Sequence, residues 1–406
     1  MSAPIIKGPV IKGWCPGALR PMESGDGLIV RVRPWMAELS LQQARGIGAL
    51  AIAHGNGFVQ ITNRANLQIR GISANGLPAL TKGLMALDLL DASAEAEAQR
   101  NILVDPFWRE PEPGHIADTP AIARGLAERL AARDAPILPG KFGFAVDAPF
   151  RMRYLADISA DIRIESAWDD LIVRADGAEL GRKVATSDAA VTLAMALAQW
   201  FVDTGGVGAD GRGRMRDHLA SGVPLPEHLM GDTKPGTRAR AYRPGDYGGR
   251  ICVGLAFGQI PAKRLIWLAD QLQGPIRVTP WRSLGLGPGI RYEELAQTGD
   301  FVIAREDPLL RVTACTGAPG CPQARGDTRQ IAFELSHDIP PGQHLHVSGC
   351  TKGCAHPGVA DVTLVATPNG YNLIRGGKAS DVPHLTDLAP HMIAAELAKA
   401  PHAAPV

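Results

Sequence analysis

The stretch Asn372-Leu-Ile-Arg-Gly-Gly-Lys-Ala379 is similar to an earlier one, Leu171-Ile-Val-Arg-Ala-Asp-Gly-Ala178. Each opens with an apolar run typical of a β-strand and ends near glycine, which favours a turn. Their surroundings also match: a strand-like run precedes each, at residues 141–146 and 344–348, and a helical run follows each, at residues 189–202 and 391–399. This pattern predicts that a larger α/β module occurs twice in the chain.

A smaller module precedes each copy. Residues 28–34 alternate and predict a strand, and Ser40 with Gln43 forms a capping box that predicts a helix ending near Gly55. A second strand is expected over residues 58–62. The same order of strand, helix and strand returns over residues 250–279, with the helix at 262–273. Thr62-Asn-Arg64 and Thr279-Pro-Trp-Arg282 then occupy matching places.

These repeats predict an α+β fold with a pseudo-two-fold duplication. Residues 205–249, rich in Gly, Arg and Pro, are expected to form a linker between the two halves. The first half is expected to have a small module at 10–90 and a larger module without cysteines at 91–204. After the linker, the second half is expected to have a small module at 250–305 and a larger module with the paired cysteines at 306–400.

Four cysteines near the C-terminal end predict a metal centre. They occur as Cys315-Thr-Gly-Ala-Pro-Gly-Cys321 and Cys350-Thr-Lys-Gly-Cys354, which is C-x5-C, a gap of 28 residues, then C-x3-C. Four thiolates in two close pairs suit a [4Fe-4S] cluster. The surrounding Gly and Pro residues would let backbone amides approach the sulfur atoms and tune the cluster.

Three other interpretations of these cysteines stay open on spacing alone. Structural zinc favours pairs spaced by two to four residues and a shorter gap between the pairs. A disulfide framework needs an oxidising compartment. Free cysteines are also often just small buried residues, and this is the expectation for Cys15 and Cys252, which have no partner at metal-like spacing.

The composition excludes several classes of function. The chain has 406 residues, 45% hydrophobic and 20% charged, and its formal net charge of +1 predicts neither a nucleic-acid nor a membrane partner. Residues 1–9 show no signal peptide, and the longest apolar stretch, 191–202, is too short to span a bilayer. We therefore expect a cytoplasmic protein with reduced thiols. No G-x-G-x-x-G follows a strand and no P-loop is present, so electrons from NAD(P)H are expected to arrive through a partner reductase.

Long motifs resemble the nitrite/sulfite reductase superfamily over residues 10–400, and within it the precorrin-3B synthase family. They are Lys12-Gly-Trp-Cys-Pro-Gly17, Met22-Glu-Ser-Gly-Asp-Gly-Leu-Ile-Val-Arg-Val-Arg-Pro34, Asn63-Arg-Ala-Asn-Leu-Gln-Ile-Arg-Gly71 and Val347-Ser-Gly-Cys-Thr-Lys-Gly-Cys-Ala-His-Pro357. The resemblance implies ferredoxin-like half-domains for the small modules and reductase-type α/β domains for the larger ones. It also implies a [4Fe-4S] cluster on Cys315, Cys321, Cys350 and Cys354.

The activity that the resemblance implies is an oxygen-dependent monooxygenation. Precorrin-3A, a tetrapyrrole of aerobic cobalamin biosynthesis, is hydroxylated at C20 with dioxygen, and a γ-lactone forms to give precorrin-3B. The family is associated with a mononuclear non-haem iron besides the cluster. The alternative within the superfamily is a sirohaem-dependent nitrite or sulfite reductase. A zinc-stabilised binding protein is a third hypothesis, which the absence of cluster and sirohaem absorption would favour.

In the sirohaem reductases, four basic residues hold the anion. Their motifs place three of them here at Arg64, Arg100 and Lys141, while the fourth place is Gly143. The missing cation weakens the reductase alternative, because reducing a bound anion needs concentrated positive charge. We expect the three cations to bind carboxylates of the macrocycle, or to orient dioxygen beside it.

The ligands of the non-haem iron are the least defined prediction. His356 is the first candidate because it follows Cys354 closely, and the other candidates are His344, His346 and His54, with Asp147 or Asp361 as the carboxylate. Asp26 could be an acid near the substrate, but turn chemistry is sufficient to explain it, so a turn residue is expected. The arginines near the first small module, Arg31, Arg33, Arg64 and Arg70, are either a carboxylate-binding rim or a solvated strand face.

Overall fold

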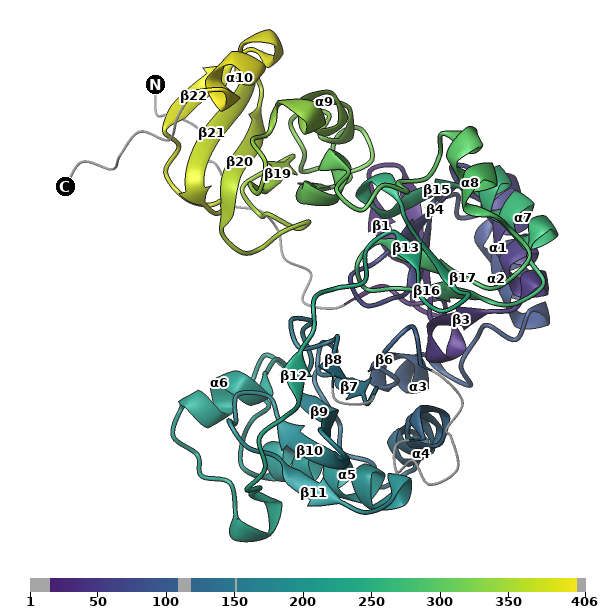
Figure 1. Ribbon diagram of the computed structural model, residues 1–406, viewed down its shortest axis with the longest axis vertical. Coiled ribbons are helices and arrows are strands. Elements are labelled where there is room, and N and C mark those ends of the chain that lie inside the picture. The colour runs from purple at the N-terminus through teal and green to yellow at the C-terminus, as the bar shows by residue number, and fades with distance from the viewer. Residues whose placement is uncertain (1–14, 109–117, 150–151, 400–406) are drawn as a thin grey trace.

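The computed structural model describes residues 15–108, 118–149 and 152–399. Residues 12–14 of the first motif, and residues 1–9, on which the signal-peptide prediction rests, lie outside them. The described chain forms four five-stranded sheets and one small two-stranded sheet. In Figure 1 the sheet formed within residues 312–388 lies at the top left, the sheet formed within residues 102–184 lies at the bottom, and the two sheets of the small modules lie together at the right.

The first two sheets exchange an edge strand. The first sheet has the order β1 (Met22–Ser24), β2 (Gly27–Val32), β5 (Leu67–Ile72), β4 (Phe58–Ile61) and β15 (Gln259–Pro261). The second has the order β13 (Gly245–Asp246), β14 (Ile251–Gly254), β17 (Ser283–Leu286), β16 (Ile276–Val278) and β3 (Glu38–Leu39). Since β15 belongs to the second half and β3 to the first, each half completes the sheet of the other.

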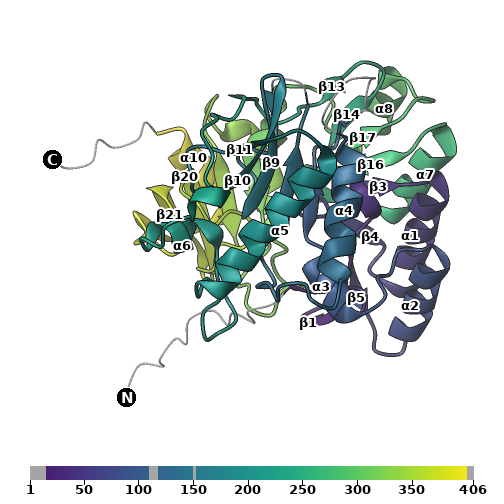
Figure 2. The same cartoon turned by 90° about the horizontal axis from the view of Figure 1, so that it is seen from below.

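Helices from both halves cover these two sheets together. The helices are α1 (Leu41–His54), α2 (Leu77–Ala86), α7 (Ala262–Gln271) and α8 (Tyr292–Thr298). Figure 2 shows α1, α2 and α7 on one outer face. A Cβ at Gly48 would lie 2.6 Å from Cγ1 of Ile266, so the glycine allows α1 and α7 to pack closely. One apolar core therefore runs through both small modules.

The two larger sheets have the same topology. The third has the order β11 (Arg182–Val184), β10 (Asp170–Ala175), β9 (Ile162–Ala167), β7 (Phe144–Asp147) and β6 (Ile102–Val104). The fourth has the order β18 (Val312–Ala314), β19 (Leu345–Ser348), β20 (Ala360–Thr367), β21 (Gly370–Gly377) and β22 (Leu385–Leu388). In each sheet, the first three strands along the chain are parallel to one another, and each of the last two strands is antiparallel to the strand before it. The predicted fold class, a pseudo-two-fold duplication, is confirmed.

The remaining helices cover the larger sheets or join the modules. They are α3 (Ala94–Gln99), α4 (Thr119–Ala131), α5 (Ser187–Asp203), α6 (Met215–Ala220), α9 (Arg329–Glu334) and α10 (Pro390–Leu397). The predicted linker contains α6 and the strand β12 (Thr237–Arg238), which pairs with β8 (Met152–Arg153). The predicted capping box of Ser40 and Gln43 starts α1, and Gly55 caps its end. Among the described residues, no helix combines the length and apolarity that a membrane crossing requires.

Candidate active site

The parallel strands of the fourth sheet bring the two cysteine pairs together. Cys315 follows β18 directly, and Cys350 comes two residues after β19. These strands are neighbours, with Ala314 opposite Val347, and the Cys315 amide donates to the carbonyl oxygen of Val347 at 3.2 Å. Because the carboxyl ends of parallel strands meet at one edge, both loops leave the sheet side by side.

Backbone amides support the first cysteine. The Gly349 amide donates to Sγ of Cys315 at 3.2 Å, and the Arg325 amide donates to the Gly349 carbonyl oxygen at 2.8 Å. A Cβ at Gly349 would lie 2.6 Å from Cβ of Ala324, so a larger residue would push the two loops apart. Gly317 and Gly353 have φ of 71° and 63°, a backbone conformation that favours glycine. These loops have the glycine-rich form that amide-to-sulfur bonding needs.

The four paired cysteines fit an iron–sulfur cluster. None forms a disulfide, and the Cys354 thiol lies in the electrostatic range of the other three. Burial raises the pKa of Cys350 and Cys354, and the neighbouring cysteines raise it further. Within the described ranges, no three His, Cys, Asp or Glu side chains converge on a single ion. In a cubane cluster each thiolate binds a different iron, so the four thiolates need not converge on one point.

The first half of the chain holds the Cys321 loop in place. Arg70, which is 5% exposed, pairs with Asp26 at 2.9 Å and donates to the carbonyl oxygen of Gly320 at 2.6 Å. Ser24 also donates to Gly320, at 2.8 Å. Asp26 is therefore more than the turn residue expected from the sequence. The role of Arg70 was missed because Gly320 is 250 residues away in the chain.

Arg70→Met is expected to destabilise the protein by about 3–5 kcal/mol, because it leaves Asp26 without its counter-charge in a partly buried place. Urea unfolding measures this loss. Arg45→Met is the matched control, since its pair with Asp270 has side chains 45% and 51% exposed and should contribute less than about 1 kcal/mol. Equal losses of unfolding free energy in the two variants would contradict the role of Arg70 in holding the Cys321 loop.

The predicted cations have different surroundings. Arg64 lies in the turn between β4 and β5 and donates from Nη2 to the Lys141 carbonyl oxygen at 2.8 Å. Burial and the nearby Arg214 lower the pKa of Arg64 to about 10, so it remains charged at neutral pH. The Lys141 side chain is exposed. Arg100 instead forms a two-point pair with Asp91, at 2.6 and 2.9 Å. The structure thus brings Arg64 and Lys141 together and engages Arg100 elsewhere.

Gly143 lies against Arg64. A Cβ at this position would be 2.7 Å from Nδ2 of Asn101 and 3.2 Å from Nη1 of Arg64. A lysine here would displace one of these side chains or shift the backbone. The place of the fourth cation is therefore filled by the Arg64 guanidinium and by Asn101.

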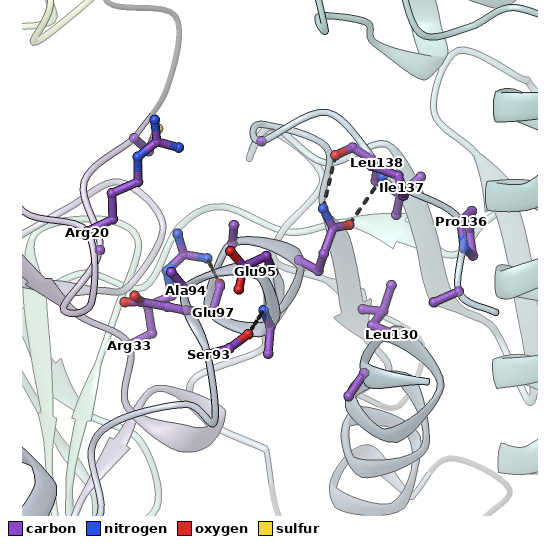
Figure 3. A pocket seen from close by; sticks show the side chains of 18 of the residues that line it. Arg20, Arg33, Ser93, Ala94, Glu95, Glu97, Leu130, Pro136, Ile137 and Leu138 are labelled. Atoms are coloured by element: carbon purple, nitrogen blue, oxygen red, sulfur yellow. Dashed lines mark hydrogen bonds between the residues drawn. The ribbon is translucent and has the colours of Figure 1, made fainter. Parts of the chain in front are cut away.

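A cavity of about 740 Å³ lies beside these residues (Figure 3). Arg20, Arg33 and Cys15 line part of it, and Ser93–Gln99, Leu130–Arg133 and Ala135–Leu138 line much of the rest. Nε of Arg33 is buried and has no hydrogen-bond partner within the described part of the chain. Arg64, Arg100 and Lys141 do not line this cavity, although Gln99 and Gly140 do. Cys15, expected to be buried, is only half-buried, whereas Cys252 is fully buried.

Three of the candidate iron ligands lie together. The His356 ring lies 4.6 Å from that of His344 and 5.7 Å from that of His346, centre to centre. Nε2 of His356 lies 3.0 Å from the Val359 carbonyl oxygen, and Nε2 of His344 lies 3.0 Å from Oγ1 of Thr313. These side chains are not arranged around one ion.

The remaining iron candidates do not join this histidine group as a ligand set. His54 ends α1 in the first half. Asp147 accepts the amides of Tyr154 and Leu155 at 2.9 and 2.6 Å. Asp361 accepts the His344 amide at 2.8 Å. The described residues therefore do not fit a mononuclear iron, and His356 as its ligand stays a prediction.

Comparison with known proteins identifies the family. Residues 20–87 match the nitrite/sulfite reductase ferredoxin-like half domain. A precorrin-3B synthase from Sinorhizobium sp is 31% identical, with 92% of this chain and 84% of the relative aligned. The chain belongs to the precorrin-3B synthase family. A ferredoxin–nitrite reductase from Synechococcus elongatus is 24% identical over 93% of this chain and 85% of its own length. This family therefore belongs to the nitrite/sulfite reductase superfamily.

A solved structure supports the fold of this precorrin-3B synthase family member. The NirA protein of Mycobacterium tuberculosis aligns with a TM-score of 0.62 and 17% identity, over 86% of this chain and 74% of that one. Relatives with curated names include nitrite and sulfite reductases, which are oxidoreductases. The spacing of the four paired cysteines is visible in the sequence, and their role as cluster ligands stays a prediction. Arg70, Arg282 and Arg329, which lie near the cysteine loops, had no local signal.

Proposed function

We propose that the protein is an oxygen-dependent monooxygenase that converts precorrin-3A into precorrin-3B. The identity to a precorrin-3B synthase over 92% of the chain carries this proposal. The reaction adds a hydroxyl group at C20 and closes a γ-lactone. Relatives named as nitrite reductases are more distant, which favours this reaction over the sirohaem-dependent alternative.

The surroundings of Arg64 support a polycarboxylate substrate. Arg64 is partly buried, and charge-assisted hydrogen bonds gain strength where water is excluded. Lys141, whose backbone carbonyl oxygen accepts from Arg64, has an exposed side chain, and Nε of Arg33, which lines the adjoining cavity, has no partner among the described residues. We propose that Arg64 and Lys141 bind carboxylates of the macrocycle. A carboxylate bound by Arg100 would have to displace Asp91.

The chain would bind its cofactor through the four paired cysteines. A [4Fe-4S] cluster on Cys315, Cys321, Cys350 and Cys354 would supply single electrons. We propose that these electrons originate from NAD(P)H and arrive through a partner reductase, and that dioxygen is the co-substrate. Free thiols at this site fit a reducing compartment, so a cytoplasmic location is part of the proposal. No step here uses a mononuclear iron.

The test compares two reactions of anaerobically purified, cluster-loaded protein. With precorrin-3A, a reductant and isotopically labelled dioxygen, one labelled oxygen atom should enter the lactone product, as measured by mass spectrometry. With reduced viologen and sulfite or nitrite, no sustained turnover is expected, because Gly143 removes one of the four cations that the reductases use. Sustained anion reduction with bound sirohaem would establish the alternative instead.

A further inference from the structure

Five aromatic rings gather where the first larger domain meets the second small module. Tyr242 is at their centre and is 8% exposed. Its ring lies 4.1 Å from Tyr154, stacked at 14°, and 4.2 Å from Phe107. Tyr247 and Trp281 lie 5.0 and 5.6 Å away, both edge-on. Three of the five tyrosines of the chain are in this group, which we term the aromatic cluster.

A buried carboxylate faces the aromatic cluster. Asp105 is 1% exposed, and Oδ2 has no hydrogen-bond partner within the described residues. Burial raises the pKa of Asp105 to about 6, while the Phe107 amide, which donates to Oδ1 at 3.2 Å, and the nearby Tyr242 partly lower it. Burial and the charge of Asp105 also raise the pKa of Tyr242, so the phenol keeps its proton. The charges of Arg277 and Arg250 also lower the pKa of Asp105, and the charge of Asp105 raises the pKa of the buried Asp147.

The pseudo-two-fold repeat gives this site a counterpart. Asp105 follows β6 as Cys315 follows β18, since Val104 pairs with Val146 as Ala314 pairs with Val347. In the first half, the Asp105 carboxylate thus takes the place that Cys315 has in the second half.

The repeat also relates the two turns of the small modules. Ile61 pairs with Leu67 and Val278 with Leu284, so Trp281 occupies the place of Arg64. An aromatic ring thus takes the place of a cation.

The aromatic cluster is connected to the cysteine loops. Trp281 is followed by Arg282, whose Nη2 donates to the carbonyl oxygen of Ala355 at 3.0 Å. Ala355 is the residue after Cys354. Trp281 thus contacts the buried Tyr242 and directly precedes the residue that binds the Cys354 loop.

We propose that Tyr242 is a redox-active tyrosine, linked through Trp281 to the cysteine site, with Asp105 as its proton acceptor. A one-electron oxidant takes an electron from Trp281, which is refilled by an electron from Tyr242. The Tyr242 O–H bond breaks as its proton passes to the Asp105 carboxylate, which leaves a neutral tyrosyl radical. One electron from the reductant and the proton from Asp105 then restore the phenol.

The role in turnover rests on the proposed function. In a monooxygenase, an activated-oxygen species that fails to meet its substrate is a strong oxidant, and the aromatic cluster would draw the oxidising equivalent away from the cysteine loops. Close packing alone would also explain five neighbouring rings. A packing role predicts no radical and no dependence on Asp105, so the two interpretations differ in a spectroscopic signal.

The test uses full-length, cluster-loaded protein and a flash-generated ruthenium(III) tris-bipyridine oxidant, which does not depend on the proposed reaction. Electron paramagnetic resonance of rapidly frozen protein with ring-deuterated tyrosine identifies a tyrosyl radical. The parent protein should give this signal, and Tyr242→Phe, which keeps the ring, should lose it and leave a tryptophan radical. Asp105→Asn should slow radical formation, because the proton acceptor is removed.

Tyr371→Phe is the matched control, since Tyr371 is 7% exposed, donates to the Asp327 carbonyl oxygen and lies outside the aromatic cluster. It should keep the parent signal. A full tyrosyl signal in Tyr242→Phe, or an unchanged rate in Asp105→Asn, would overturn the proposal. If the parent protein gives the tyrosyl radical but shows no monooxygenase activity with precorrin-3A, the proposed function alone would be wrong.

Discussion

Replacing Cys321 with serine is expected to remove the iron–sulfur cluster almost completely. Each of the four thiolates would bind one iron of the cubane, and an alcohol is a much weaker ligand for iron than a thiolate. The Cys321 loop is also where Arg70 and Ser24 of the first half meet the second, through Gly320. Iron and acid-labile sulfide should fall from about four each per chain to near zero, and the fourth sheet should unfold at lower denaturant.

Cys15→Ser is the control for this loss. Cys15 is half-buried beside Arg33 and lines the cavity, away from the cysteine loops. Its iron content should equal that of the parent protein, as measured by metal analysis and absorption spectroscopy. A full complement of iron and sulfide in Cys321→Ser would show that the ligand assignment is wrong.

The second large effect is expected for Arg64→Ala. A charge-assisted hydrogen bond contributes about 1.5–3 kcal/mol, which corresponds to a loss of tetrapyrrole affinity of about 10- to 150-fold. The guanidinium donates to the Lys141 carbonyl oxygen, and among the described residues the cysteine that acts on its charge is Cys15, not one of the four paired cysteines, so the cluster content should not change. Precorrin-3A affinity and lactone yield, measured against the parent, test this expectation.

Arg45→Ala removes a remote, exposed arginine and should leave both the affinity and the yield unchanged. Arg100→Ala is expected to act differently from Arg64→Ala, because Arg100 is already paired with Asp91. It should lower the free energy of unfolding more than the affinity. Parent-like affinity and yield in Arg64→Ala would show that Arg64 is only a turn residue.

The strand and helix periodicity of the repeats predicted the main elements of each module. The alternation at residues 28–34 became β2, and the capping box at Ser40 became the start of α1. The helix expected over 262–273 ends two residues earlier, at Gln271. These features depend on neighbours within a few residues, which the sequence displays directly.

The exchange of β3 and β15 was not predictable from the sequence. Each strand is only two or three residues long, and its partner lies about half a chain away. For the same reason, the clamp of Arg70 on Gly320 carries no local signal. The predicted linker at 205–249 likewise gave no sign that Tyr242 would be buried among rings from three other segments.

The sequence by itself determined the duplication, the fold class and the arrangement of four cysteines in two closely spaced pairs along the chain, because periodicity and spacing are local properties of the chain. Only the tertiary structure decided that Arg64 lies with Lys141, that Arg100 is held by Asp91, and that Gly143 has no room for a side chain. The same holds for Asp105, whose burial beside Tyr242 depends on the packing of four segments. Partner choice and burial arise from contacts between distant segments, and no short stretch of sequence encodes them.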